Sequence, residues 1–173
     1  LTITSLVKHG INTASTLAIV NGTVGVSAVS DGFHAEGFSM NAGNMTITSL
    51  GDGIDAGDGA VAISGGTINI TSTSNDVKAI KTGTNTITVS GGTINLTVSG
   101  AQSKGISAKG DIIITNGTFA ITLSGATVLV AETSGFNPSY ACGLKSDGQI
   151  AISGGTFTMQ LLVAADGGKG FSA

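Results

Sequence analysis

The 173-residue sequence contains no Trp, one Pro, one Cys and only 10% charged residues. The single Pro excludes a collagen triple helix, and mean hydropathy of +0.40 with a net charge of −3 excludes a disordered chain. No apolar run reaches about 18 residues, so no transmembrane helix is encoded. Seven basic residues, all Lys, and a pI near 5.0 argue against a nucleic-acid-binding surface. Cys142 cannot form an internal disulfide and therefore gives no information on compartment.

Gly, by contrast, is abundant, with 28 residues, and it recurs at regular intervals. The second residue of a turn resembling Gly-Gly-Thr stands at positions 22, 43, 66, 92, 117 and 155. A second motif, Gly or Ala followed by apolar-x-small, begins at positions 10, 32, 53, 79, 105, 143 and 170. Two independent motifs that keep one period indicate a repeat protein.

Apolar residues alternate with polar ones on both sides of each turn, as in Val61/Ile63 before Gly66 and Ile68/Ile70 after it. This alternation predicts short, half-buried strands. Each apolar residue lies one repeat from an apolar counterpart. The sequence therefore predicts an all-β fold, a right-handed parallel β-helix (β-solenoid) of about 6–7 coils of 21–27 residues with one coil of 38. Gly fits its corners, which need positive φ and close backbone contacts.

We interpret residues 1–173 as a single β-solenoid domain with a loop insertion at 126–141 in the sixth coil. Both ends stop within a repeat, and neither resembles a cap. We therefore expect a segment of a longer chain, or coils that stack on neighbouring molecules. The insertion fits either a functional loop or a shield for a strand edge.

The two motifs differ in charge. The outward residues around the Gly-Gly-Thr turns are mainly Thr and Asn, with no charge, which fits a stacked structural face. A flat Thr array that binds ice or a polymer is the alternative. All seven Lys and most Asp lie around the second motif, so the sequence predicts one charged edge along the solenoid.

Three carboxylates occur within residues 51–59, and one more occurs in the coil on each side. Oxygen ligands among Gly residues suit Ca²⁺. The predicted Ca²⁺ ligands are Asp31, Asp52, Asp55, Asp58 and Asp76. The alternative is that Asp52 pairs with Lys78 and Asp55 with Lys81 between adjacent coils.

His9 and His34 lie one coil apart at different ladder positions, and we interpret them as polar surface residues rather than a transition-metal site. Cys142 is interpreted as a packed thiol. Catalysis is disfavoured: a lyase of this fold typically uses an Arg as base, and nothing apolar surrounds Asp52 and Asp55 to raise a pKa for hydrolysis. We therefore expect no enzyme activity.

Four sequence features resemble one known family: residues 51–56 (GDGIDA), 103–114 (SKGISAKGDIII), 138–148 (PSYACGLKSDG) and the Gly-Gly-Thr-Ile turns. Together, over roughly residues 30–173, they resemble secreted bacterial β-helix proteins described as carbohydrate-binding. The resemblance implies a secreted or cell-surface protein that binds Ca²⁺ and acidic plant-wall polymers such as polygalacturonate. Asp52 and Asp55 match its likeliest cation ligands. The fourth coil has Asn75-Asp76-Val77 in place of Gly-Asp-Gly, and coils five to seven have Lys or Cys where Asp would stand. Any Ca²⁺ site is therefore expected only in coils two to four.

An acidic polysaccharide also fits the side chains, because few aromatic residues are free to stack on neutral sugars. The predicted ligand-binding residues are Lys78, Lys81, Lys104, Lys145, Phe136 and Tyr140. The competing hypothesis is a structural rod of an adhesin or extracellular filament, with solenoids associating end to end.

Overall fold

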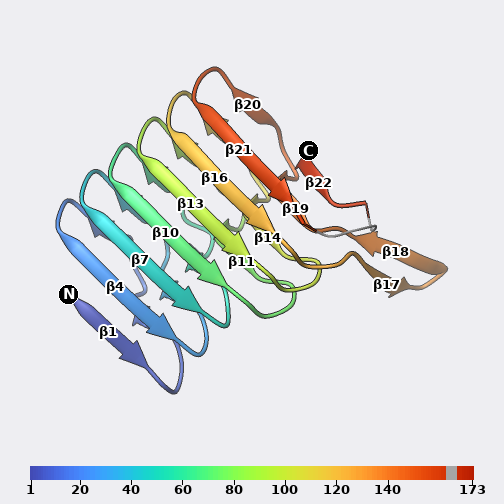
Figure 1. Cartoon of the computed structure of the whole chain (residues 1–173), viewed down its shortest axis with the longest axis horizontal. Coiled ribbons are helices and arrows are strands. Elements are labelled where there is room, and N and C mark those ends of the chain that lie inside the picture. The colour runs from blue at the N-terminus through green and yellow to red at the C-terminus, as the bar shows by residue number, and fades with distance from the viewer. Residues whose placement is uncertain (163–166) are drawn as a thin grey trace.

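The computed structural model describes residues 1–162 and 167–173, and these residues form a β-solenoid without a helix (Figure 1). Each coil contributes strands to three sheets, and successive coils pair in parallel within each sheet. The front strands in Figure 1 run towards the lower right while the coils advance towards the upper right, so the chain winds right-handedly. The predicted fold class is confirmed.

The sheet that follows the Gly-Gly-Thr turns, here the uncharged sheet, has seven described strands. They are β1 (Thr2–Ser5), β4 (Thr23–Ala28), β7 (Asn44–Ser49), β10 (Thr67–Ser72), β13 (Thr93–Val98), β16 (Thr118–Leu123) and β21 (Thr156–Leu161). The sheet at the second motif, here the charged sheet, also has seven described strands. They are β2 (Ile11–Asn12), β5 (Phe33–His34), β8 (Ile54–Asp55), β11 (Lys78–Thr82), β14 (Lys104–Ala108), β19 (Cys142–Ser146) and β22 (Lys169–Ser172).

The third sheet precedes the Gly-Gly-Thr turns and has six described strands. They are β3 (Leu17–Ile19), β6 (Phe38–Met40), β9 (Val61–Ile63), β12 (Ile87–Val89), β15 (Ile112–Ile114) and β20 (Ile150–Ile152). The register agrees with the predicted ladders: Ile68 pairs with Met45 of the previous coil and Ile94 of the next. Equivalent apolar residues therefore stack on one another between coils.

The core lies inside the three sheets, where the inward residues of the middle coils are fully buried. Ile54, Ile80 and Ile106 from the charged sheet have 0% exposure. Phe119 and Phe157 stack with ring centroids 4.4 Å apart. Burial falls in the outermost described coils, where Phe171 is 49% exposed. The core is thus set by the repeat, and each coil completes the burial of its neighbours.

The glycines of the two motifs serve different purposes. All six glycines at the second position of the Gly-Gly-Thr turns have positive φ, for example +84° at Gly66, a conformation that favours Gly. Gly53 of the second motif instead lies against its neighbours: a Cβ there would be 2.5 Å from the carbonyl oxygen of Ala79 and 2.4 Å from Ile70. Backbone geometry explains one motif and close packing explains the other.

Within the predicted insertion at 126–141 lies an antiparallel hairpin, β17 (Val128–Glu132) and β18 (Gly135–Ser139). It projects from the solenoid beside β19 and β22 (Figure 1). Leu129 and Phe136 of the hairpin are exposed, at 64% and 70%, and Phe136 lies near its tip. Among the described residues, no helix has the length and apolarity to cross a membrane.

Candidate functional site

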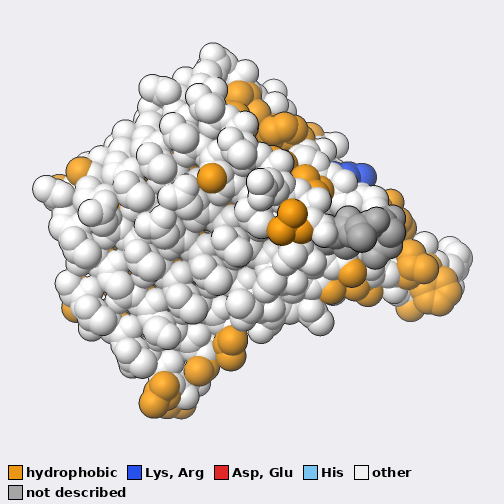
Figure 2. All heavy atoms as spheres, in the orientation of Figure 1, with side chains coloured by type: hydrophobic (Ala, Val, Ile, Leu, Met, Phe, Trp, Pro, Cys, Tyr) orange, Lys and Arg blue, Asp and Glu red, His pale blue; other side chains and the backbone are white. Residues whose placement is uncertain are grey.

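Positive charges form a ladder along the charged sheet. Lys78, Lys104, Cys142 and Lys169 occupy one register position in four successive coils. Lys81 and Lys145 occupy a second position, three residues further along their strands, with Ser107 between them. Coils in parallel pairing are about 4.8 Å apart, so the ammonium groups are held close together. The uncharged sheet has no such ladder, and its face in Figure 2 shows no acidic side chain and Lys only at one margin.

Two neighbouring cavities lie over this ladder and share Lys104 and Lys145. The larger has a volume of about 520 Å³. Its charged lining residues are Glu36, Asp55, Asp58, Asp76, Lys78, Lys81, Lys104, Lys109, Lys145 and Asp147. The smaller, of about 270 Å³, lies between the ladder and hairpin β17–β18. Together the two cavities extend the site from the second coil to the last described strand.

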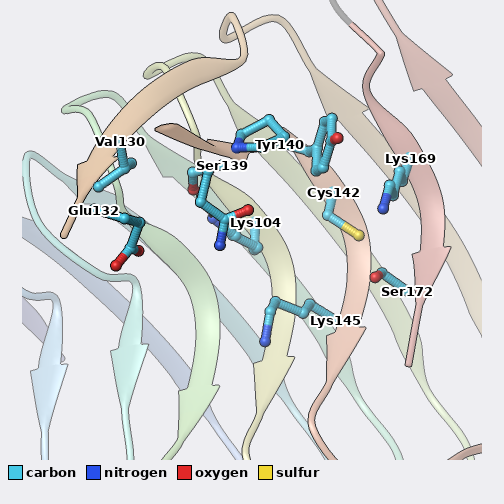
Figure 3. Close-up of a pocket in the computed structure, with 11 residues that line it drawn as sticks. Lys104, Val130, Glu132, Ser139, Tyr140, Cys142, Lys145, Lys169 and Ser172 are labelled. Atoms are coloured by element: carbon cyan, nitrogen blue, oxygen red, sulfur yellow. Dashed lines mark hydrogen bonds between the residues drawn. The ribbon is translucent and has the colours of Figure 1, made fainter. Parts of the chain in front are cut away.

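The smaller cavity is lined by three lysines and one aromatic ring. Figure 3 shows Lys104, Lys145 and Lys169 coming from three adjacent strands, with Tyr140 and Ser139 at the hairpin end. Lys169 Nζ lies 4.2 Å from the centroid of the Tyr140 ring, a cation–π contact. Glu132 is its one acidic lining residue among the described residues. The cavity therefore suits an anionic group.

Lys104 is the most enclosed of these lysines, with 7% exposure. Its Nζ donates to the carbonyl oxygen of Gln102 and lies 3.3 Å from the Ser139 hydroxyl. Burial lowers the pKa of Lys104, with Asp76 acting in the opposite direction. An ammonium group that is partly stripped of water and has only a distant carboxylate, 4.0 Å away, would gain from an anionic ligand.

Phe136 and Tyr140, the predicted aromatic contacts, are placed differently. Tyr140 lines the smaller cavity, whereas Phe136 lines neither cavity and lies exposed near the hairpin tip. Sequence reasoning did not single out Lys169, Ser139 or Glu132, which also line the smaller cavity. Lys169 had a usable signal, because it falls in register with Lys104 and Cys142. The hairpin residues had none, because they lie outside the repeat.

At the other end of the larger cavity, Lys81 joins the two central carboxylates. Lys81 Nζ lies 2.9 Å from Asp55 Oδ2 and 3.1 Å from Asp52 Oδ2. The predicted Asp55–Lys81 pair is confirmed. The predicted Asp52–Lys78 side-chain pair is wrong: Lys78 instead pairs with Asp76, at 2.9 Å, and only its backbone N–H reaches Asp52, at 2.6 Å. Lys78 thus pairs with a carboxylate of its own coil, two residues away in the sequence.

The two carboxyl groups have different acidities. Burial raises the pKa of Asp52, although the Lys78 N–H and the Lys81 ammonium act against it. Burial also opposes ionisation of Asp55, but hydrogen bonding and charge from Lys81, with the Gly57 N–H, outweigh it and lower the pKa of Asp55. For Lys81, burial is likewise outweighed, and its carboxylate partners raise its pKa. The expectation that nothing in this region raises a pKa is thus wrong for Asp52.

Several aspartates hold backbone N–H groups of the next coil. Asp31 Oδ1 accepts from the Asp52 N–H at 2.8 Å, and Asp58 Oδ1 from the Thr84 N–H at 3.0 Å. With Lys81 on Asp52 and Asp55, each of the five predicted Ca²⁺ ligands has a partner in the described chain. The five carboxylates do not gather around one point, so this arrangement does not fit a single ion held by all five.

The structure does bring together two residues that sequence reasoning set aside. His9 and His34 stack with ring centroids 4.7 Å apart, and both Nδ1 atoms face Asp31. Their ladder positions differ, but the corner of the coil brings them side by side. Cys142 is buried, as predicted, at 2% exposure; its thiol donates to the Leu144 carbonyl oxygen, and burial raises the pKa of the thiol.

A comparison with models of known protein families identifies the family of this chain. A model described as carbohydrate-binding domain-containing protein matches residues 1–103 and 81–168. The chain belongs to this carbohydrate-binding domain family. No curated protein matches the sequence significantly, and no solved structure does either. Membership of this family implies a carbohydrate ligand.

Proposed function

We propose that this carbohydrate-binding domain binds an acidic, polygalacturonate-like polysaccharide along the two cavities of the charged sheet. The observation that carries the proposal is the lysine ladder: Lys78, Lys104, Lys145 and Lys169 come from four successive coils and line the cavities. A polymer with one carboxylate per sugar presents negative charges at regular intervals. A rigid row of ammonium groups complements such a chain.

The aromatic residues support an acidic ligand over a neutral one. Neutral sugar rings are held by contact with exposed aromatic faces. Tyr140 is the one aromatic residue lining the two cavities among the described residues, and Lys169 lies over its ring. Little aromatic surface is left for stacking on sugar rings, so charged side chains would make the main contacts with the ligand.

Calcium is the second component of the proposal. Glu36, Asp58 and Asp76 line the larger cavity together with the lysines, and Ca²⁺ is held by oxygen ligands of this kind. Lys81 pairs with Asp52 and Asp55, and Lys78 pairs with Asp76, so these three carboxylates would contribute only if the ammonium groups moved away. We therefore propose Ca²⁺ as an aid to polymer binding at the acidic end of the cavity.

The proposed protein binds without catalysis. Asp52, whose pKa burial raises, is tied to Lys81 and to the Lys78 backbone N–H rather than left free to donate a proton. We also propose a secreted or cell-surface location, because acidic wall polysaccharides lie outside cells. Release of reducing ends or of unsaturated sugars from polygalacturonate would contradict the non-catalytic part.

Isothermal calorimetry with polygalacturonate tests the proposal. The titration is run in Ca²⁺, in EDTA, and with a fully methyl-esterified polymer as a neutral control. We expect binding to the acidic polymer, weakening as salt rises, and none to the neutral control. Loss in EDTA supports the calcium component, whereas unchanged binding in EDTA removes that component alone. Equal binding to the neutral polymer would overturn the proposed ligand class.

End-to-end association of solenoids is the competing function. In the described chain, β1 and β21 are the outermost strands of the uncharged sheet and each pairs on one side only. Such open edges can pair with another copy. Filaments seen by electron microscopy, with no polygalacturonate binding in either Ca²⁺ or EDTA, would favour the rod over the carbohydrate proposal.

A further inference from the structure

A cluster of two imidazoles and one carboxylate lies at the corner of the first two coils. His9 precedes β2, Asp31 precedes β5, and His34 ends β5. One nitrogen of each His and one oxygen of Asp31 lie within 4.8 Å of one another. In the described chain this is the one group of three such ligand residues with that spacing. None of the three residues lines either cavity of the charged sheet.

The contacts within the cluster are close but are not hydrogen bonds. His9 Nδ1 lies 3.0 Å from Asp31 Oδ2, and His34 Nδ1 lies 3.6 Å from the same oxygen. Both Nδ1 atoms are buried and have no hydrogen-bond partner in the structure. A buried nitrogen without a partner is costly. Both nitrogens and the carboxylate oxygen could be satisfied together by one cation that binds between them.

We propose that His9, Asp31 and His34 bind one divalent transition-metal ion of the Zn²⁺ class. Imidazole and carboxylate are ordinary Zn²⁺ ligands, with bonds of about 2.0–2.2 Å. Ligand atoms on one tetrahedral ion are therefore roughly 3.3 Å apart. The observed separations of 3.0 and 3.6 Å lie on either side of that value, so small side-chain movements suffice.

Hydrogen bonds behind the ligands orient this cluster, as they do in known metal sites. The Asp52 N–H donates to Asp31 Oδ1 at 2.8 Å and leaves Oδ2 facing the two histidines. Asp55 Oδ2 lies 3.4 Å from His34 Nδ1 but is held by Lys81, so it serves as a neighbour rather than a ligand. Three protein ligands leave a coordination position for water or an oxygen of another molecule.

The two imidazole ligands distinguish this site from the proposed Ca²⁺ site. Ca²⁺ takes six to eight oxygen ligands and seldom imidazole. Asp31, a predicted Ca²⁺ ligand, is thus assigned here to a different metal. The inference does not depend on carbohydrate binding.

The test is titration of the protein without a His tag with Zn²⁺, and with Co²⁺ as a spectroscopic probe. We expect one ion per chain, a visible Co²⁺ absorption that reports nitrogen ligation, and a rise in Tm on Zn²⁺ addition. His9→Gln and His34→Gln should each weaken Zn²⁺ binding at least 10-fold and abolish the rise in Tm. Asp31 is left intact, because it also accepts the Asp52 N–H.

Asp111→Asn is the matched control, because Asp111 accepts a backbone N–H of the next coil, as Asp31 does, but lies outside the cluster and outside both cavities; its Zn²⁺ affinity should equal that of the wild type. Circular dichroism establishes that each variant keeps the β-solenoid. No Zn²⁺ binding by the wild type, or equal affinity in the folded His34→Gln variant, would overturn the proposal. Polygalacturonate binding is measured in parallel, so that failure of one proposal is told apart from failure of the other.

Discussion

The uncharged and charged sheets share one chain, one winding and one core, yet their outward surfaces differ. The uncharged sheet presents stacked Thr and Asn, and Asn95 donates to Asn69 of the previous coil at 2.8 Å. The charged sheet presents Lys and Asp side chains. Some of them form ion pairs, and several line the two cavities. Inward residues therefore fix the fold, while outward ladders are free to carry different surfaces. The predictions below test that division.

The largest effect is expected where both sheets depend on the core. Ile80 lies beneath the lysines with 0% exposure, and Ile80→Ala removes buried apolar groups and leaves a cavity. The free energy of unfolding should fall by about 2–5 kcal/mol, measured by urea denaturation. A cost below about 0.5 kcal/mol would contradict a shared, close-packed core.

Removing charge from the ladder should weaken polymer binding without unfolding the solenoid. Lys78→Ala combined with Lys145→Ala deletes two ammonium groups from the larger cavity. Polygalacturonate affinity should fall at least 10-fold, about 1.4 kcal/mol or more, by calorimetry. The matched control is Thr71→Ala with Thr97→Ala on the uncharged sheet, which should bind like the wild type. Equal losses in both double variants would erase the functional difference between the sheets.

The Lys81 pairs should give the charged sheet a pH dependence that the uncharged sheet lacks. The lowered pKa of Asp55 adds stability that is present above the ordinary value of 3.8 and is lost as pH falls through the folded value. The raised pKa of Lys81 adds stability present below 10.5 and lost as pH rises through the folded value.

Lys81→Met should therefore lower Tm most between those limits. Screening by solvent limits the loss to about 1 kcal/mol, or roughly 2–4 °C. Thermal scans from acid to alkaline pH check this, with the wild-type and variant curves converging at both extremes. A pH-independent difference would show that lost packing, rather than charge, is responsible.

The smallest effect is expected on the uncharged sheet. Asn95→Ala removes one hydrogen bond between half-buried side chains, so the free energy of unfolding should fall by about 0.5–1 kcal/mol. Polymer affinity should stay unchanged. A loss of polymer affinity in this variant would show that part of the binding surface lies on the uncharged sheet, which would contradict the proposal.

The fold could be predicted because two glycine motifs and three apolar ladders repeat in one register, as the pairing of Met45, Ile68 and Ile94 shows. Lys78 and Lys104 of the candidate site were predictable because they follow the repeat, and Tyr140 was predictable because it is one of the few aromatic residues outside the core ladders. The ion-pair partners could not all be predicted, because Lys78 pairs with Asp76 of its own coil, and Asp52 pairs with Lys81 instead.

Two further features had no signal in the ladders. The His9–His34 contact arises at a corner, where side chains at different register positions meet. Hairpin β17–β18 lies outside the repeat, so its contribution of Ser139 and Tyr140 to the smaller cavity depends on tertiary packing. The position of a residue within the repeat predicts its neighbour in the next coil. Contacts made at corners and by insertions cannot be predicted in this way, because they depend on the three-dimensional path of the chain.

The central claim is that the carbohydrate lies on the charged sheet, and a two-dimensional NMR titration with an oligogalacturonate tests it most directly. The account predicts shifts at backbone amides of β11, β14, β19 and β22, including Lys104 and Lys145, and no change along β7, β10 and β13. Shifts confined to the threonine ladder of β10, β13 and β16, with Lys104 and Lys145 unmoved, would contradict it.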